Sequence, residues 1–231
     1  MALNLTYNNK NIHDKTDPDI QQLYTELMIV GGIFWSLTYV LIIRQGFHDR
    51  TYGMPLAALC ANISWEGIFA FIYPHTAPQL YINYLWFSLD TIIVFQFLKF
   101  GKKEFSNFSP GQFYIIFIFA LIMALCSILV VTYEFHDRQG AYAAFGQNLM
   151  MSVLFLWMFF SRNNLRGQSI YIATFKMLGT GISSLAFYLY QPISQGSYLM
   201  PFFYLTIFIC DAAYTLMVYR RSSEQVKVKV Q

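Results

Sequence analysis

Charged side chains are scarce in this chain: only 12% of its 231 residues are Asp, Glu, Lys or Arg. A soluble domain carries about 25% charged residues. By contrast, 56% of the residues are hydrophobic, and they form runs of roughly 20 residues, long enough to cross a hydrocarbon core as a helix. The lack of charge excludes an ordinary soluble domain and predicts an all-α, polytopic membrane protein.

Cysteine and internal symmetry are also lacking. The three cysteines, Cys60, Cys126 and Cys210, lie far apart inside apolar runs, which excludes the usual metal-ligand spacing and predicts small packing residues. No cleavable signal peptide is expected before the first apolar run. The two halves of the chain show no visible repeat, although carriers built from two related halves do.

We predict a bundle of seven transmembrane helices. They are expected at residues 27–43, 54–73, 80–98, 112–133, 141–160, 170–190 and 198–219. Short polar or breaker-rich links separate them, and Gly179 and Gly181 in "LGTGISS" predict a close helix contact. The chain thus divides into a polar N-terminal segment (1–26), the helical domain (27–219) and a basic cytoplasmic tail (220–231).

Lysine and arginine are unevenly distributed over the links. Of the 15 in the chain, Lys10, Lys15 and Arg138 lie on one side of the predicted bundle, Lys176 lies within a span, and the other eleven lie on the opposite side. Positive residues collect in cytoplasmic loops, so we expect a non-cytoplasmic N-terminus and a cytoplasmic C-terminus. The net charge of +3 therefore reflects topology and does not indicate nucleic-acid binding.

Four ionisable residues remain inside the predicted spans: Glu66, Asp90, Lys176 and Asp211. Each costs about 2.5 to 3.5 kcal/mol near the centre of a lone helix, and such residues usually face the bundle interior and mark function. A purely structural ion pair between helices is the alternative. Counting the helical rise places Lys176 at the level of Asp90 and Asp211, with Glu66 about one turn further out.

Lys176 can neutralise one of the aspartates, which leaves other carboxyl groups without a cation. Removal from water disfavours the charged form of a carboxyl group, so a dry Glu66 would keep its proton and could donate it. Protonation of an epoxide or an alkene makes a carbocation, which aromatic faces stabilise. Trp65 can line the same pocket, while Asn62 and Phe69 share the helical face of Glu66, where Asn62 could orient the carboxyl group.

Several motifs occur in one order along the chain: "NISWE", with Glu66, in the second span and "LWFSLD", with Asp90, in the third. "GQNLMMSVLF" follows in the fifth span, "GQSIYIATFKMLGT" in the sixth and "CDAAY", with Asp211, in the seventh. In these motifs, in length and in number of spans, the chain resembles the integral-membrane terpene cyclases of fungal meroterpenoid pathways, of the pyripyropene type, and their bacterial relatives. The resemblance covers nearly the whole chain.

This resemblance implies protonation-initiated cyclisation of a prenyl chain to a polycyclic terpenoid. In the family the prenyl chain is often attached to an aromatic or indole head, and a terminal epoxide is often the initiating group. The two essential acids of the family correspond to Glu66 and Asp211, one of which delivers the proton, whereas Asp90 opposite Lys176 would set the local charge. An upstream prenyltransferase and an epoxidase are the implied pathway partners.

The resemblance implies no cofactor and no metal, because no diphosphate is ionised. The chain accordingly lacks the DDxxD and NSE-type magnesium motifs and the DxDD motif of soluble protonating cyclases. The expected location is the lipid bilayer as a multi-pass protein, in the endoplasmic reticulum of a eukaryote or the plasma membrane of a bacterium.

A proton-coupled transporter of small molecules is the main alternative function. Intramembrane acids with one lysine fit such a carrier, whereas the lack of an internal repeat speaks against it. A retinal protein is disfavoured, since the last predicted span contains no lysine.

Overall fold

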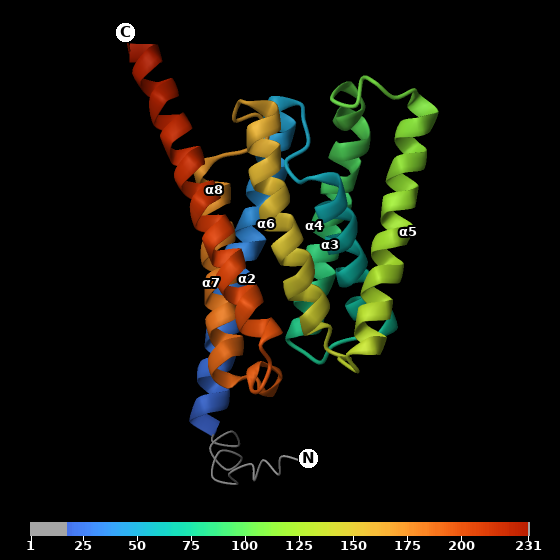
Figure 1. Cartoon of the computed structure of the whole chain (residues 1–231), viewed down its shortest axis with the longest axis vertical. Helices are drawn as coiled ribbons and strands as arrows, with labels where there is room; N and C mark the ends of the chain where they lie inside the picture. The colour runs from blue at the N-terminus through green and yellow to red at the C-terminus, as the bar shows by residue number, and fades with distance from the viewer. Residues whose placement is uncertain (1–17, 231) are drawn as a thin grey trace, which may run out of the picture.

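The computed structural model describes residues 18–230, which form helices joined by short loops, with no strand in that range. Figure 1 shows the helices running roughly along one direction. The seven α-helices of the described residues are α2 (Pro18–Asp49), α3 (Leu56–Gly67), α4 (Gln79–Phe100), α5 (Pro110–Glu134), α6 (Ala141–Arg162), α7 (Ile170–Tyr190) and α8 (Leu199–Val230). The predicted all-α bundle of seven helices is therefore confirmed.

Six of these helices are long and apolar enough to cross a membrane. The exception in the described residues is the second predicted span, where a shorter apolar stretch, Leu56–Ile72, combines α3 with the π-helix η2 (Ile68–Ile72). In a π-helix each backbone hydrogen bond spans five residues instead of the four of an α-helix, and such turns often occur at functional sites. Glu66 lies two residues before the start of this π-helix.

The first and last helices extend beyond the predicted spans. The first helix begins at Pro18, ahead of residue 27, and the last continues to Val230, beyond residue 219. Apolarity marks only the part of a helix that suits hydrocarbon, whereas Asp19 in the first turn favours a helix start by its charge. Residues 1–17 of the predicted N-terminal segment lie outside the described residues.

Helix starts follow from local sequence. Ser109 accepts a hydrogen bond from the backbone N–H of Gln112, whose side chain accepts one from the N–H of Ser109, and Pro110 occupies the first helical position of α5. Ser169 caps α7 in the same manner through the N–H of Ile172. These caps fix the point at which each helix enters the bundle.

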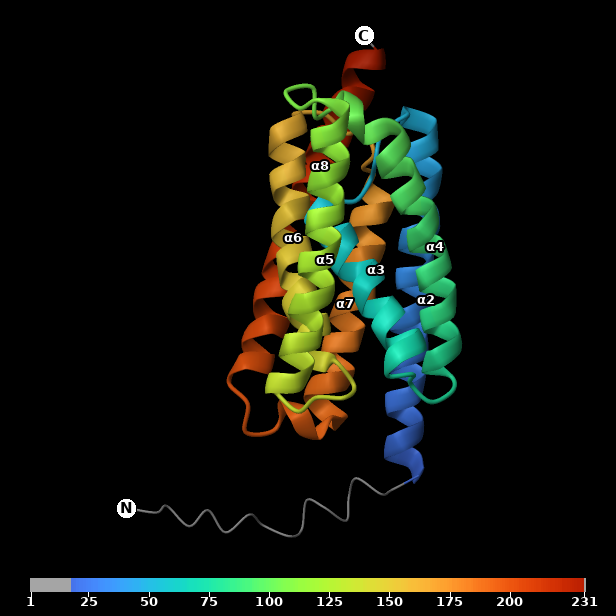
Figure 2. The same ribbon diagram turned by 90° about the vertical axis from the view of Figure 1, so that its right-hand side faces the viewer.

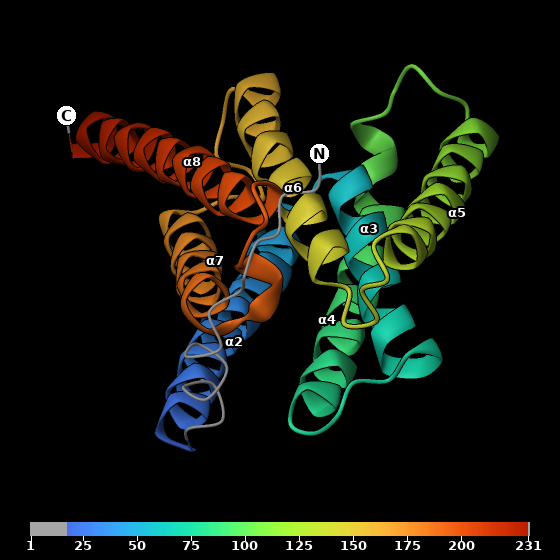
Figure 3. The same ribbon diagram turned by 60° about the horizontal axis from the view of Figure 1, so that its bottom comes forward.

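Helix α2 is the centre of one half of the bundle. It packs along α7 on one side and α4 on the other, and Figures 2 and 3 show it in that place. Gly31 and Gly179 allow the close approach, because a Cβ added to either would lie 3.1–3.2 Å from the other's carbonyl oxygen. The predicted small-residue contact at Gly179 is thus confirmed. Helix α3 fills the other half, among α4, α5 and α6.

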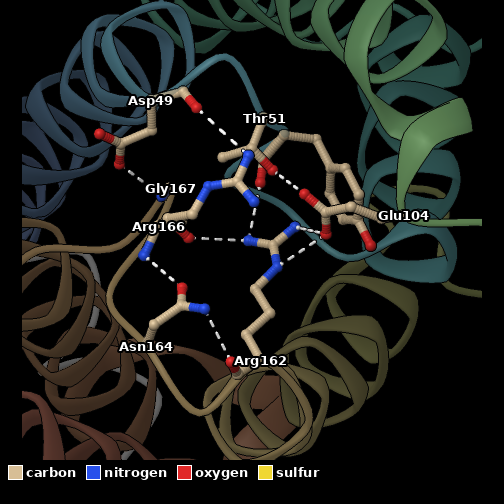
Figure 4. Close-up of polar contacts among 8 residues, drawn as sticks. Asp49, Thr51, Glu104, Arg162, Asn164, Arg166 and Gly167 are labelled. Carbon is tan, nitrogen blue, oxygen red and sulfur yellow. Dashed lines mark hydrogen bonds and ion pairs between the residues drawn. The ribbon is translucent and has the colours of Figure 1, made fainter.

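The end of the bundle where α2 finishes is closed by polar contacts between loops (Figure 4). The Arg162 guanidinium forms an ion pair of 2.8 Å with Glu104 and lies 4.3 Å from the centroid of the Tyr52 ring. It also donates to the backbone carbonyls of Tyr52 and Arg166. The backbone N–H of Gly167 donates to Asp49 at 2.7 Å. These contacts tie three loops together at this closed end.

Candidate active site

A cavity of about 830 Å³ lies between α2, α3, α4, α6 and α7 and reaches the loops at the end opposite the closed one. Its volume is in the range of small-molecule sites, about 300 to 1,000 Å³. Eight aromatic residues line it: Tyr24, Trp35, Tyr39, Trp65, Trp86, Phe145, Phe187 and Tyr190. A cavity with such walls suits an elongated apolar ligand.

Two carboxyl groups, Glu66 and Asp90, are joined by one amide. Asn62 Nδ2 donates to Glu66 Oε1 at 3.1 Å and to Asp90 Oδ2 at 2.8 Å. Tyr39 Oη donates to the same Glu66 oxygen at 2.8 Å and is itself contacted by the Asn62 amide. The bond from Asn62 to Glu66 is the one that their spacing of four residues predicts. All four side chains are buried, with Glu66 only 1% exposed.

One oxygen of each carboxyl group remains without a partner. Glu66 Oε2 and Asp90 Oδ1 are buried and accept no hydrogen bond from any described residue. Unpartnered buried polar atoms are costly and call for an explanation. For Glu66 Oε2, a proton on that oxygen or a ligand group in the cavity that Glu66 lines would provide a partner.

Trp65 is held at the cavity wall by the loop between α5 and α6. Its Nε1–H donates to the Gly140 carbonyl at 2.9 Å. Behind it lies Phe69, whose ring centroid is 4.9 Å from that of Trp65 and 5.0 Å from the stacked ring of His75. The backbone carbonyl of Phe69 accepts hydrogen bonds from the backbone N–H of His75 and from the side-chain amide of Asn83. These contacts hold the Trp65 ring, which lies before the π-helix, and the Phe69 carbonyl, which lies within it.

His75 connects the two loops at the open end as a neutral ring. Its Nδ1 lies 3.0 Å from the Asn83 amide nitrogen, and its Nε2 lies 3.2 Å from the Gln139 carbonyl oxygen. Nδ1 must accept and Nε2–H must donate, which defines one neutral tautomer. Burial lowers the pKa of His75 below its ordinary value, although Gln139 and the charge of Asp137 act in the opposite direction.

Gly140 adopts a left-handed backbone with φ of +66°, and an added Cβ would overlap the Phe69 ring and lie 2.9 Å from Trp65 Nε1. Gly140→Ala is therefore expected to displace Trp65, destabilise the protein by about 1 to 3 kcal/mol and reduce turnover. Thermal unfolding in detergent and product formation in membranes measure the two effects.

Gly196→Ala is the matched control for this variant. Gly196 has a similar φ of +75°, but nothing lies within 4 Å of an added Cβ. It therefore carries the backbone strain without the collision. Equal losses in the two variants would contradict the assigned role of Gly140.

Lys176 and Asp211 form a second buried cluster. Lys176 Nζ lies 2.6 Å from Asp211 Oδ1, donates to Ser152 Oγ at 2.7 Å and reaches Asn148 Oδ1 at 3.5 Å. Asn148, which lines the cavity, also donates to Thr180 at 3.1 Å. Asp211 itself lines a smaller groove of about 310 Å³ between α7 and α8.

The structure corrects two expectations about these residues. Asp90 does not lie opposite Lys176: it belongs to the Glu66 cluster, and the partner of Lys176 is Asp211. Equal depth did not imply proximity, because α2 lies between α4 and α7. Phe69 is fully buried and lies outside the cavity lining, since the π-helix turns it behind Trp65, whereas Trp65, Asn62 and Glu66 do line the cavity.

Tyr39 and Gln147 are site residues that the sequence analysis missed. Tyr39 is one of 17 tyrosines and nothing in its apolar surroundings singles it out. Gln147 lines the cavity and has a buried carbonyl oxygen without a partner in the described residues. A polar side chain inside a predicted span was the available signal for Gln147.

Within the described residues, no three His, Cys, Asp or Glu side chains gather as a metal-binding group. Cys60 is buried in the core as predicted, but Cys126 is exposed on α5 and Cys210 is partly exposed. The expectation that all three are packing residues was therefore wrong for Cys126, because it lies on the outward face of α5.

A family model for Pyr4-like transmembrane terpene cyclases matches residues 14–224, a range that contains both buried clusters. The chain is 32% identical over 172 residues to the Pyr4-family terpene cyclase mfmH of Annulohypoxylon moriforme, a match that covers 72% of this chain and 70% of that protein.

Two further relatives extend this result. The asnovolin H synthase nvfL of Aspergillus novofumigatus is 28% identical over 172 residues, with 71% and 70% of the two chains covered. The terpene cyclase dpmaB of Metarhizium anisopliae is 26% identical over 214 residues, with 87% and 88% covered. The likeness thus extends over almost the whole chain.

Proposed function

This chain belongs to the Pyr4-like transmembrane terpene cyclases, integral membrane enzymes, and from that premise we propose that Glu66 is the acid that starts the cyclisation. The observation that carries this proposal is the carboxyl pair of Glu66 and Asp90, bridged by Asn62 and buried at an aromatic cavity. The substrate would be a prenyl chain, with or without a terminal epoxide, on an aromatic or indole head.

The pair supports an uncharged Glu66. Two carboxylates that share one amide, away from water, repel each other, so the pair holds at least one proton. We place it on Glu66, because Glu66 is the carboxyl group of the pair that lines the cavity. Its Oε1 accepts from both Tyr39 and Asn62, and its Oε2 has no partner among the described residues. Oε2 is therefore the oxygen from which a proton would be donated.

The proposed first step breaks the O–H bond of Glu66. With an epoxide, the proton goes to the epoxide oxygen, one C–O bond breaks with its electron pair on oxygen, and a tertiary carbocation remains. Alkenes of the chain then add in turn to form C–C bonds. The last cation loses a proton from carbon, which restores the acid, so the reaction is a net isomerisation that consumes no co-reactant.

The walls of the cavity suit the cationic intermediates. The rings of Trp35 and Trp86 lie 5.8 and 6.1 Å from that of Tyr39, the hydrogen-bond partner of Glu66. Each desolvated contact of an aromatic face with a cation is worth about 2 kcal/mol. Such walls also exclude water, which would otherwise quench the cation.

Asp211 would act differently from Glu66. Its ion pair with Lys176 keeps it a hydrogen-bond acceptor, and it lines the groove between α7 and α8 and not the large cavity. We assign it to positioning: it holds Lys176, which in turn contacts Asn148 at the cavity wall. Of the two acids, this division makes Glu66 the proton donor.

The experiment that tests the proposal supplies candidate substrates to isolated membranes. Membranes that contain the protein are incubated with a farnesylated dihydroxybenzoic ester, either plain or with a terminal epoxide, and the products are separated by mass spectrometry. We expect a cyclic isomer of unchanged mass from at least one of them. Membranes without the protein provide the baseline, and counterflow of a labelled substrate without any isomer would indicate transport instead.

The proposed substrate also implies which reactions must come before this one. A prenyltransferase must attach the chain, and an epoxidase must act before the epoxide route can begin. Both enzymes would precede this one in its pathway.

A further inference from the structure

We propose that the open end of the cavity binds an anionic head group through Arg138, so that the substrate lies with its prenyl tail toward Glu66. This inference rests on the proposed function, because it concerns the substrate of the same cavity. It adds the chemical class of the head and the direction in which the substrate is held.

An acid and a cation lie at opposite ends of the cavity. Among the described residues that line it, Glu66 is the one with a carboxyl group and Arg138 is the one with a guanidinium or ammonium group, while His75 is held as a neutral ring. Glu66 lies deep, in the cluster with Tyr39, whereas Arg138 lies on the loop between α5 and α6. Because Glu66 is assigned as an uncharged acid, Arg138 provides the cavity's charge and favours a negative head.

The side chain of Arg138 is available for such a head. It is exposed and has no hydrogen bond or ion pair to any described residue. The neighbouring carboxylate, Asp137, is occupied elsewhere: it accepts from the backbone N–H groups of Gln139 at 3.2 Å and Tyr142 at 2.9 Å. Within the described residues Arg138 therefore forms no ion pair with its own loop.

The backbone beneath Arg138 is fixed to the cavity wall. The carbonyl of Gln139 accepts from His75, and that of Gly140 accepts from Trp65. Together with the Asp137 bonds, these contacts hold the residues on both sides of Arg138. A guanidinium on an anchored turn is partly pre-organised, which reduces the entropy lost on binding and suits the paired oxygens of a carboxylate.

The polarity and length of the cavity agree with this direction. Its open end carries uncharged polar side chains, which are Gln21, Thr25, Thr76, Gln79, Gln139 and Gln191. Deeper, beside Glu66, the lining includes the rings of Trp35, Tyr39, Trp65 and Trp86. Along α2 the lining runs from Gln21 to Tyr39, about 27 Å at 1.5 Å per residue, which accommodates a head and several isoprene units end to end.

The test compares two probes that differ in head charge. One is an epoxyfarnesyl chain on a dihydroxybenzoic acid, and the other is its methyl ester. Binding is measured by quenching of tryptophan fluorescence, since Trp35, Trp65 and Trp86 line the cavity, and turnover is measured separately by mass spectrometry. For wild type we expect tighter binding of the acid than of the ester.

Arg138→Gln should reduce this preference roughly tenfold or more, the loss expected for one hydrogen bond between charged groups. Arg138→Lys should retain part of it. Lys102→Gln, which removes an exposed charge from the loop after α4 at the closed end, should leave the acid-to-ester ratio as in wild type.

The outcomes separate this proposal from the proposed function. No binding, no acid preference, or an unchanged ratio in Arg138→Gln overturns the head site, and cyclisation by the same preparation would leave the cyclase proposal standing. Conversely, a ratio that shifts as expected without any cyclic isomer supports the head site and counts against the proposed chemistry.

Discussion

Glu66→Gln is expected to abolish cyclisation while the protein still accumulates in the membrane. Glutamine has nearly the shape of glutamic acid, and its carbonyl oxygen can still accept from Tyr39 and Asn62. It has no acidic proton, so the initiating step is lost. General acids contribute about a hundredfold to ten-thousandfold, and we expect a loss in that range, measured as cyclic product per amount of protein in membranes.

Asp90→Asn is the matched comparison. Asp90 is as buried as Glu66 and shares the Asn62 amide, but it does not line the cavity. Removing its charge should weaken the orientation of Asn62 and reduce turnover, with activity still measurable. A fully active Glu66→Gln, or an Asp90→Asn that is inactive beside an active Glu66→Gln, would refute the assignment of the donor.

The fold could be predicted because the membrane imposes a simple pattern. Apolar runs separated by polar links located seven helices, and the run at 170–190 coincides with α7. The same pattern could not show the π-helix at Ile68–Ile72, since its cause is tertiary: the carbonyl of Phe69 is held by Asn83 of α4 and by His75. Nor could apolarity show how far α2 and α8 extend beyond the hydrocarbon region.

The site could be predicted in part. Ionisable residues are rare inside the predicted spans, which made Glu66, Asp90, Lys176 and Asp211 conspicuous. The structure places all four in buried clusters. Their pairing could not be predicted, because counting residues along a helix gives depth but not the direction around the bundle axis. Tyr39 was hidden for another reason: a tyrosine among many carries no distinguishing signal until its hydroxyl is seen to reach Glu66.

The two clusters also differ in what their charges can do. Glu66 and Asp90 have no cation among their hydrogen-bonding partners in the described residues, and the proposed function depends on the proton that they hold. Lys176 and Asp211 neutralise each other at 2.6 Å, so their net charge is near zero and their geometry is the useful feature. This difference predicts that substitutions in the second cluster affect folding before chemistry.

Lys176→Met is accordingly expected to destabilise the protein by about 3 to 5 kcal/mol, because it leaves the Asp211 carboxylate buried without a counter-ion. Asp211 is 1% exposed and Lys176 is fully buried, so solvent cannot compensate. Methionine has a similar length, which keeps the loss of packing small. Yield in the membrane and the midpoint of thermal unfolding in detergent measure the effect.

The double variant Lys176→Met with Asp211→Leu separates charge from shape. Replacing a buried ion pair by apolar residues of similar volume is often neutral or stabilising, so most of the lost stability should return. Turnover should remain at least several-fold below wild type, since Asn148 at the cavity wall no longer contacts the ammonium group. A single variant as stable as wild type would show that Asp211 does not need its counter-ion, and a fully active double variant would show that the pair only joins helices.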